Sequence, residues 1–445
     1  MSQNSEDLPE DLLENVDEVM DSLSNELREM YSFRDLFFEN HPIEMAPEKN
    51  KLVEEKKTKL LEKFEAIDVE RHIPDQHRAQ FLFMKGRCCN ISTVYDAQAV
   101  QYLSKAVKLN PKLVDAWNEL GECYWKNLNI KEAKYSFEGG LKFERSVVAL
   151  RCLSILLRQE CSGKSRAEAR PIVLKSVELA REAVAQNVQD GQSWSVLGNA
   201  YLCQIITLGD EPTFKLCTGA YDQAWKDPIA RSLPDLSYNR AVVSRFEESY
   251  AKALMLLEHS CRLDPQWQPP RVELARLTSY LRSIDELVRT RGKIKERKLT
   301  QMVKRLDRRM VGEQAGAEGA RVVPLAELCA GGGAGGAPGE VALGVVVGSV
   351  HHENTVPFTF AMADGGGACV CVTVYNWARG RGVIVGDCVC VPRPRAAHHR
   401  HDAAQLKYDF KSIRVDDPTR LVVNGRPVPP DQYATTRVSS TYEAQ

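Results

Sequence analysis

Two pairs of cysteines in the second half of the chain have a spacing that invites comparison with metal sites. They are Cys369 with Cys371, and Cys388 with Cys390. Structural zinc usually requires about two to four residues between paired cysteines, whereas a one-residue gap on a strand merely places both thiols on one face. We therefore interpret them as buried apolar thiols and predict no metal and no cofactor. The nearby His398, His399 and His401 are expected to lie in a loop.

A basic run offers a second kind of chemistry. It contains Lys293, Lys295, Arg297 and Lys298, and it continues with Lys304, Arg305, Arg308 and Arg309. Such a run favours electrostatic contact with a phosphate backbone, for which ribosomal RNA is one candidate. A solvated helix face and a nuclear localisation signal are the alternatives.

Motifs of catalysis are not found in the sequence. The Gly/Ala tract from Ala330 to Glu340 lacks the Lys-Ser/Thr that a phosphate-binding loop needs, and no Gly-x-Ser-x-Gly elbow occurs. We therefore expect a protein that is not an enzyme.

The cysteines, the N-terminus and the apolar runs lead us to expect a cytoplasmic and nuclear protein. The thirteen cysteines have no framework spacing, so we expect reduced thiols. The acidic N-terminus lacks the basic start and apolar stretch of a signal peptide. No apolar run approaches the roughly 20 residues of a membrane span, so no membrane partner is expected.

The elements that would position these residues begin with a helical repeat. Residues 114–143 contain "AWNELGECYW" followed by Ala133 and Phe137, which fits the tetratricopeptide pattern W-x2-L-G-x2-Y with A-x3-F. "SWSVLGNAYL" at 193–202 repeats the first helix, and "LRCLSILLRQ" at 150–159 is a degenerate copy. The small Gly lets paired helices approach closely. The pattern predicts an α-solenoid.

The second half is β-rich. Short β-branched runs such as "VALGVVVGSV" and "GVIVGDCVCVP" favour five or six strands in a small OB-like barrel. The fold class is therefore mainly α with a C-terminal β domain. The predicted domains are capping helices at 1–75 (helices at 8–40 and 49–69), a tetratricopeptide solenoid at 76–310, a Gly/Ala-rich linker at 311–340, an OB-like barrel at 341–430 and a flexible tail at 431–445. An insertion is expected between Cys203 and Leu233.

The combination of "AWNELGECYW" and "SWSVLGNAYL" with the later "VPFTF", "VYNW", "GVIVGD" and "LVVNG" resembles the tetratricopeptide repeat protein 5 (stress-responsive co-activator Strap) family. The resemblance implies an adaptor with two described roles. One is recognition of the N-terminus of nascent tubulin at the ribosome near the tunnel exit, leading through an mRNA-decay adaptor to tubulin mRNA decay. The other, the alternative, is a nuclear scaffold for acetyltransferase co-activators in the p53 stress response.

First helices line the concave surface of such a solenoid, so the register gives candidate peptide-binding residues. On the second repeat they are Asp115, Asn118, Glu119, Glu122 and Lys126; on later repeats they include Arg151, Arg158, Ser195, Asn199, Asp235, Tyr238, Asn239 and Arg240. Nascent tubulin begins with Met, Arg and Glu. We expect Asp235 to bind the peptide Arg and Arg158 the peptide Glu.

Two alternatives remain open for the other candidates. Asn199 and Asn239 would hydrogen-bond the peptide backbone or else bond to the adjacent repeat. The barrel would bind single-stranded nucleic acid if its aromatic residues were exposed, although aromatics in strands are more often core. Those aromatics are Phe358, Phe360, Tyr375, Trp377 and Tyr408, with Arg379, Arg381, Arg393 and Arg395 nearby.

Overall fold

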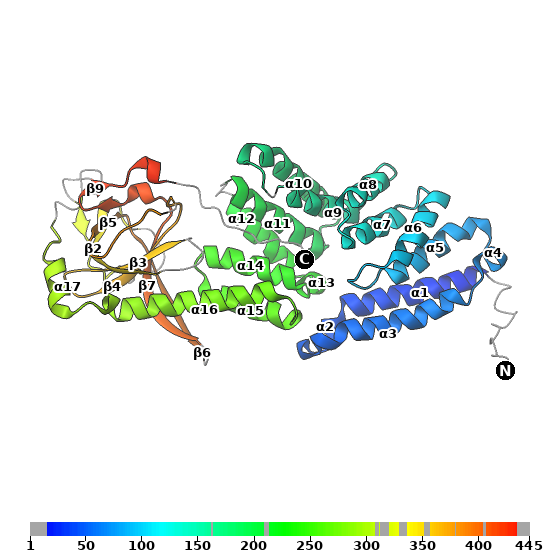
Figure 1. Ribbon diagram of the computed structural model, residues 1–445, viewed down its shortest axis with the longest axis horizontal. Helices are drawn as coiled ribbons and strands as arrows, with labels where there is room; N and C mark the ends of the chain where they lie inside the picture. The colour runs from blue at the N-terminus through cyan, green and yellow to red at the C-terminus, as the bar shows by residue number, and fades with distance from the viewer. Residues whose placement is uncertain are drawn as a thin grey trace. The chain divides into compact units, whose positions relative to one another are not determined.

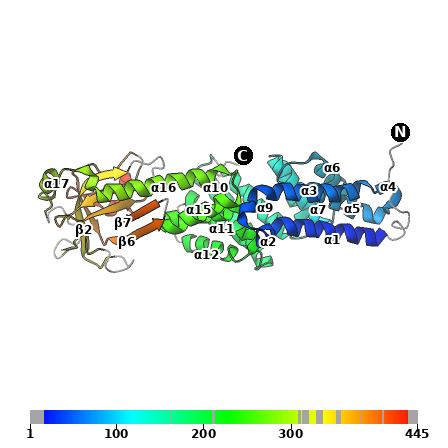
Figure 2. The same cartoon turned by 90° about the horizontal axis from the view of Figure 1, so that it is seen from below.

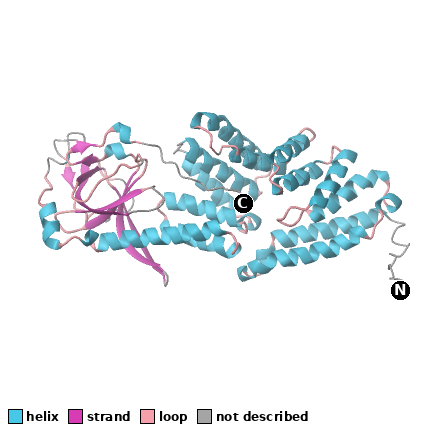
Figure 3. Ribbon diagram, viewed as in Figure 1, coloured by secondary structure: helices cyan, strands magenta, loops and turns pink. Residues whose placement is uncertain are grey.

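The computed structural model describes residues 16–161, 163–208, 213–307, 311, 320–328, 336–350, 357–378, 380–403 and 406–433. Its contacts divide these residues into two compact units, one formed by 16–243 with 258–268 and the other by 244–257 with 269–433. The first unit is helical and the second combines helices with a sheet (Figure 3). Among the described helices, none is both long enough and apolar enough to cross a membrane.

The N-terminal helices pack on the first repeat. Helices α1 (Val16–Asp35), α2 (Phe37–Asn40) and α3 (Ala46–Glu65) confirm the predicted helices over the described residues, and α4 (Val69–His72) follows them. Helices α1 and α3 run side by side in two perpendicular views (Figures 1 and 2). Their apolar residues, among them Leu27 and Phe64, join those of the first repeat in one hydrophobic cluster. The apolar end of the first repeat is thereby covered.

The repeats form helix pairs in the predicted register. The pairs are α5 (Asp75–Cys89) with α6 (Ala97–Leu109), α7 (Val114–Lys126) with α8 (Ile130–Leu141), α9 (Val147–Gln159) with α10 (Arg166–Gln186), α11 (Gly191–Leu208) with α12 (Thr213–Ala224), and α14 (Pro234–Phe246) with α15 (Tyr250–Leu263). The short α13 (Pro228–Arg231) lies within the predicted insertion.

Glycine has a steric reason to occupy the small position. A Cβ at Gly121 would lie 2.6 Å from the ring of Phe137, and one at Gly198 would lie 2.5 Å from the ring of Tyr221. In the degenerate repeat Ser154 takes this position, and its hydroxyl donates to the carbonyl oxygen of Ser176 at 2.9 Å. The close helix pairs therefore depend on a small residue at this position of each first helix.

Within the described residues, the sheet of the second unit contains nine strands. They are β1 (Arg321–Val322), β2 (Glu340–Val350), β3 (Phe358–Ala363), β4 (Cys369–Val374), β5 (Cys388–Pro392), β6 (Arg395–Ala403), β7 (Leu406–Val415), β8 (Val422–Val423) and β9 (Arg426–Pro427). The pairing order is β6-β7-β4-β3-β2-β5-β8-β9, with β1 beside β2, and only β4–β7 and β1–β2 are parallel. Described strands β6 and β9 do not pair with each other, so the sheet is not closed into the expected barrel.

The prediction of a loop at His398–His401 was wrong. These residues lie in β6, which pairs with β7 along its whole length from Arg395↔Arg414 to Ala403↔Leu406. Arg, His and Ala are not strong strand formers, so the sequence carried little sign of a strand. Here, the ladder with β7 overrides local preference. Specific side-chain pairs add to it, since the His398 and Arg400 side chains both contact Asp409.

Helices pack against this sheet within the second unit. Helix α16 (Gln268–Arg289) reaches it through Tyr280, whose hydroxyl lies 2.7 Å from the Thr359 hydroxyl. Helix α17 (Glu296–Val303) buries Leu299 and Met302 against β2 and β3. The single turn η3 (Arg291–Lys293) joins the two helices. The contacts thus place 269–307 with the sheet, although these residues were predicted to belong to the solenoid.

A buried polar cluster joins the α14–α15 turn to the sheet in this unit. Glu248, 6% exposed, accepts hydrogen bonds from the Thr373 hydroxyl at 2.6 Å and the Tyr375 hydroxyl at 3.1 Å. Arg414 donates to the Phe246 carbonyl oxygen, and its guanidinium lies 4.1 Å from the Tyr375 ring centroid. Burial raises the pKa of Glu248, while Arg414 acts in the opposite direction.

Part of the predicted linker is ordered into the sheet. Strand β1 pairs with β2, and Leu325 is fully buried in the sheet's core. Alternating apolar residues at Val323 and Leu325 are the local reason. Most of the Gly/Ala tract, the last twelve residues of the predicted tail, and the first fifteen residues of the chain lie outside the described residues.

Candidate peptide-binding groove

A cavity of about 220 Å³ lies among the first helices of four repeats. Helix α9 contributes one face with Arg151, Ile155 and Arg158, which follow one another at spacings of four and three residues. Such spacing places side chains on one side of a helix. The remaining lining residues are Glu122 from α7, Cys152 from α9, Gln192, Ser195, Val196 and Asn199 from α11, Leu233, and Asp235 from α14.

Arg158 is held at the cavity by hydroxyl groups. Its Nη1 donates to the Ser154 hydroxyl at 2.9 Å and lies 3.3 Å from the Ser176 hydroxyl and 3.5 Å from the Val196 carbonyl oxygen. Both serines are fully buried. A guanidinium has five donors in a fixed planar fork. The two serines therefore orient this fork within the lining of the cavity.

Asp235 brings the opposite charge to the same cavity from the first turn of α14. Burial raises the pKa of this carboxyl above its usual value; backbone N–H groups at the start of the helix and the charge of Arg158 act in the opposite direction. A cation that entered the cavity would favour the ionised form of Asp235. The arrangement thus offers one anionic and one cationic contact to a ligand with both charges.

Other predicted residues are engaged by the protein itself. Arg151 lines the cavity but donates to Asp190 at 2.7 Å. The Asn199 side-chain oxygen accepts from the Tyr221 hydroxyl at 2.7 Å and from the Asn239 amide at 3.0 Å. Asn239 is buried and does not line the cavity. The alternative of bonding to an adjacent repeat therefore applies to both asparagines.

Tyr238 and Arg240 contact neighbouring helices outside the cavity lining. The Tyr238 ring meets Trp267 edge to face at 5.3 Å between centroids. Arg240 forms an ion pair with Asp222, and its guanidinium lies 4.8 Å from the Trp225 ring centroid. We therefore place neither residue in the candidate site.

Most of the predicted residues of the second repeat contact the neighbouring repeats. Glu119 accepts from Asn90 at 2.7 Å and pairs with Arg87 at 3.0 Å, while Lys126 donates to the Asn90 carbonyl and side-chain oxygens. Burial, together with repulsion from Glu122, raises the pKa of Glu119 to about 7. Of this group only Glu122 lines the cavity.

Sequence reasoning missed the apolar part of the cavity. Ile155, Val196 and Leu233 line it, and none of them is among the predicted residues, which are all polar or aromatic. Spacing could have found two of them, since Ile155 precedes Arg158 by three residues and Val196 precedes Asn199 by three.

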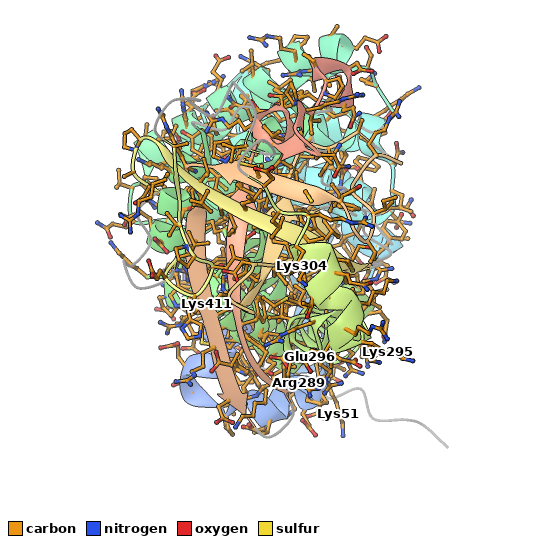
Figure 4. All side chains as sticks on the ribbon, turned by 90° about the vertical axis from the view of Figure 1, so that its left-hand side faces the viewer. Lys51, Arg289, Lys295, Glu296, Lys304 and Lys411 are labelled. Carbon is orange, nitrogen blue, oxygen red and sulfur yellow. The ribbon has the colours of Figure 1, made fainter. Side chains whose placement is uncertain are left out.

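The basic run lies on the second unit around α17. Lys295, Arg297 and Lys298 are exposed, whereas Leu299 and Met302 of the same helix are buried. Figure 4 shows Arg289, Lys295 and Lys304 around this helix. Lys293 pairs with Glu286 at 2.8 Å, whereas ion pairs within the described chain are not found for Lys295, Arg297 or Lys298. Arg308 and Arg309 lie outside the described residues.

The aromatic residues of the sheet do not form a platform for bases. Phe360, Tyr375 and Tyr408 are each at most 2% exposed, and Phe358 and Trp377 pack edge to face on each other at 5.3 Å. Base stacking needs an exposed ring face. Cys371, Cys388 and Cys390 are buried as predicted, whereas Cys369, which was predicted to be buried too, is half-buried.

The paired helices, with their Trp, Leu, Gly and Tyr positions, and the sheet that follows them define a tetratricopeptide-repeat protein with a C-terminal OB-type domain. The model of the tetratricopeptide repeat protein 5 OB fold domain matches residues 321–437. Tetratricopeptide repeat protein 5 of Homo sapiens is 38% identical over 438 residues, covering 96% of this chain and 98% of the relative; that of Bos taurus is 37% identical with the same coverage. The chain belongs to the tetratricopeptide repeat protein 5 family, and is an adaptor of the tetratricopeptide-repeat type.

Solved structures also match the helical part at low identity. A tetratricopeptide protein of Thermus thermophilus is 14% identical with a TM-score of 0.34, covering 46% of this chain and 98% of its own. YrrB, described as a tetratricopeptide protein with an unusual peptide-binding site, is 18% identical with a TM-score of 0.31, covering 49% and 96%.

Proposed function

We propose that the cavity binds the N-terminal peptide of nascent tubulin at the ribosome, and that this recognition leads, through an mRNA-decay adaptor, to tubulin mRNA decay. The observation that carries the proposal is the presence of Arg158 and Asp235 in the lining of one cavity. A peptide that begins with Met, Arg and Glu offers the complementary charges in adjacent positions. The protein would act without catalysis, in the cytoplasm and the nucleus.

Each part of the cavity would take one peptide side chain. Asp235 would accept from the peptide Arg, and Arg158 would donate to the peptide Glu. The apolar residues Ile155, Val196 and Leu233 would surround the peptide Met. Asn199 also lines the cavity; because Tyr221 and Asn239 already donate to its side-chain oxygen, its NH2 group would donate to a backbone carbonyl of the peptide.

The basic run would bring the protein to ribosomal RNA near the tunnel exit. The exposed Lys295, Arg297 and Lys298 support this part of the proposal, because unpaired surface cations release counterions when they meet phosphate. In the alternative role, a nuclear scaffold for acetyltransferase co-activators, the cavity would take another peptide and the run would act as an import signal.

Site-specific crosslinking in a translating lysate tests the peptide assignment. A photo-reactive residue replaces Gln192, which lines the cavity, or Glu178, an exposed control on α10. We expect crosslinks to nascent tubulin from position 192 only, and their loss when the peptide's Arg and Glu are exchanged. Equal crosslinking from both positions, or indifference to the exchange, would contradict the proposal.

A further inference from the structure

The tip of the N-terminal hairpin contacts the far end of the row of repeats. This hairpin consists of α1, α2, the single turn η2 (Ile43–Met45) and α3. Glu39 of α2 pairs with Arg231 of α13 at 2.9 Å, although 192 residues separate them in sequence. Glu44 of η2 pairs with Arg262 of α15 at 2.7 Å across 218 residues. All four residues belong to the first unit, and Figure 1 shows α2 next to α13 and α15.

The other end of the hairpin is attached on the side of the repeats that bears the cavity. The Tyr31 hydroxyl of α1 donates to the Arg87 carbonyl oxygen of α5 at 3.0 Å, and the Arg87 side chain pairs with Glu119 of α7 at 3.0 Å. Glu119 and the cavity residue Glu122 are three residues apart, so they share one side of α7. Neighbouring repeats contact one another from α5 to α13. The hairpin thus closes the row of repeats into a ring around the concave surface.

The two attachments of the hairpin differ in kind. At the first repeat the contact is apolar and buried, as where the fully buried rings of Phe64 and Phe81 meet edge to face at 5.4 Å. At α13 and α15 the ion pairs are exposed: the Arg231 and Glu39 side chains are 40% and 46% exposed, and those of Arg262 and Glu44 are 58% and 69% exposed. Exposed ion pairs contribute little to stability and are screened by salt. The ring is therefore weakest at the tip of the hairpin.

We propose that the Glu39–Arg231 and Glu44–Arg262 ion pairs form a clasp, which opens and closes the ring around the concave surface. The buried contact with the first repeat stays in place when the clasp opens. With the clasp closed, an extended chain can reach the concave surface only end first, through the ring. With the clasp open, the chain can also enter from the side. The clasp depends on the repeats and the hairpin alone, so it stands whether or not the cavity binds the tubulin peptide.

The distribution of charge in the clasp makes it testable. Both acidic residues lie on the hairpin, and both arginines lie on the repeats. Reversing the charge of the two glutamates would therefore place four positive charges together and drive the clasp open. Exchanging the charges on both sides would restore two attractive pairs. A variant that is merely damaged would not recover in this way.

Fluorescence energy transfer within the full-length protein measures whether the clasp is closed. A donor and an acceptor are attached to non-natural amino acids at Asn40 and Gln266, two exposed positions close in sequence to the paired residues. We expect the unaltered protein to show high transfer that falls as the ionic strength rises, because salt screens the ion pairs. Glu39→Arg combined with Glu44→Arg should remove most of the high-transfer population at low salt.

Two further variants separate the clasp from a general effect of charge. Adding Arg231→Glu and Arg262→Glu to the double glutamate variant should restore high transfer at low salt. Glu62→Arg combined with Glu65→Arg makes the same change in net charge at two exposed positions of α3, and it should leave the transfer as in the unaltered protein. Transfer that neither salt nor the double glutamate variant lowers would overturn the proposal. Failure of the charge exchange to restore transfer would also overturn it.

Discussion

The cavity among the first helices and the polar cluster around Glu248 both bury opposite charges, but they satisfy them differently. Glu248 accepts from two hydroxyl groups and lies near Arg414, which itself binds a backbone carbonyl. In the cavity, Arg158 is held by neutral serines, and burial raises the pKa of Asp235. Between these two charges is an open volume that a ligand can enter.

The charges of the Glu248 cluster therefore stabilise the fold, whereas those of the cavity are placed to contact a ligand. A buried charge whose partners are supplied by the fold stabilises that fold's one arrangement. A charged group that lines an open volume can in addition contact a ligand that enters that volume. We therefore expect substitutions in the cluster to change stability, and substitutions in the cavity to change affinity.

The largest effect is expected at the cluster. Glu248→Ala should lower the free energy of unfolding by about 3 kcal/mol, because it leaves two hydroxyl groups and Arg414 without their buried carboxylate. Denaturant unfolding followed by circular dichroism measures this loss. Glu248→Gln should lose less, since the amide oxygen still accepts a hydrogen bond.

Glu258→Ala is the matched control, because this glutamate is exposed on α15. It should leave the unfolding midpoint nearly unchanged, and tubulin-peptide affinity should survive in all three variants. An unfolding midpoint for Glu248→Ala equal to that of the unaltered protein would show that the Glu248 cluster does not stabilise the fold.

The next largest effect is expected in the cavity. Arg158→Ala and Asp235→Ala should each weaken binding of a fluorescent tubulin N-terminal peptide by about 2 kcal/mol or more, as when one member of a desolvated charge pair is removed. The two losses should be separable. A peptide with Glu changed to Gln should lose little further affinity in Arg158→Ala, yet remain sensitive to Asp235→Ala.

Exposed ion pairs supply the matched controls for this titration. Arg145→Ala removes a positive charge just before α9, where Arg145 forms an exposed ion pair with Glu182. Asp75→Ala removes a carboxylate that is 90% exposed. Both should bind the peptide normally. Unchanged affinity in Arg158→Ala and Asp235→Ala together would mean that the peptide does not use this cavity.

The smallest effect per residue is expected at the basic run, where the charges are exposed and screened by salt. Lys295→Glu combined with Arg297→Glu should weaken ribosome co-sedimentation and reduce its salt dependence, while peptide affinity stays unchanged. Lys293 is not substituted, because Lys293→Glu would also break the ion pair with Glu286. Equal sedimentation of variant and parent at low salt would contradict ribosome contact through this run.

The sequence predicted those features that depend on local spacing. Trp117 and Gly121 recur as Trp194 and Gly198 because close helix pairs need the same packing in every repeat. The same register placed Arg151, Arg158, Asn199 and Asp235 on first helices, and all four line one cavity. Tyr238, Asn239 and Arg240 were also predicted to face the groove, but their side chains contact Trp267, Asn199 and Asp222 instead of lining the cavity.

The features that it missed depend on contacts between distant residues. Strand β6 exists because β7 pairs with it, which no property of His398 or Arg400 indicates. The role of Glu248 was hidden for the same reason, since Thr373 and Tyr375 are more than a hundred residues away. Helix α16 falls within the predicted solenoid at 76–310, but it packs on the sheet, where the Tyr280 hydroxyl contacts that of Thr359.

Strand β6 also has a bearing on how molecules of this protein meet one another. It pairs with β7 on one side, and no other described strand pairs with its second side. A long open edge of this kind can recruit strands from other chains and so begin aggregation. The charged and histidine side chains at Arg395, Arg400 and His401 oppose such stacking, because a second copy would bring like charges together. Residues that made this segment hard to recognise as a strand would thus help keep the protein in solution as separate molecules.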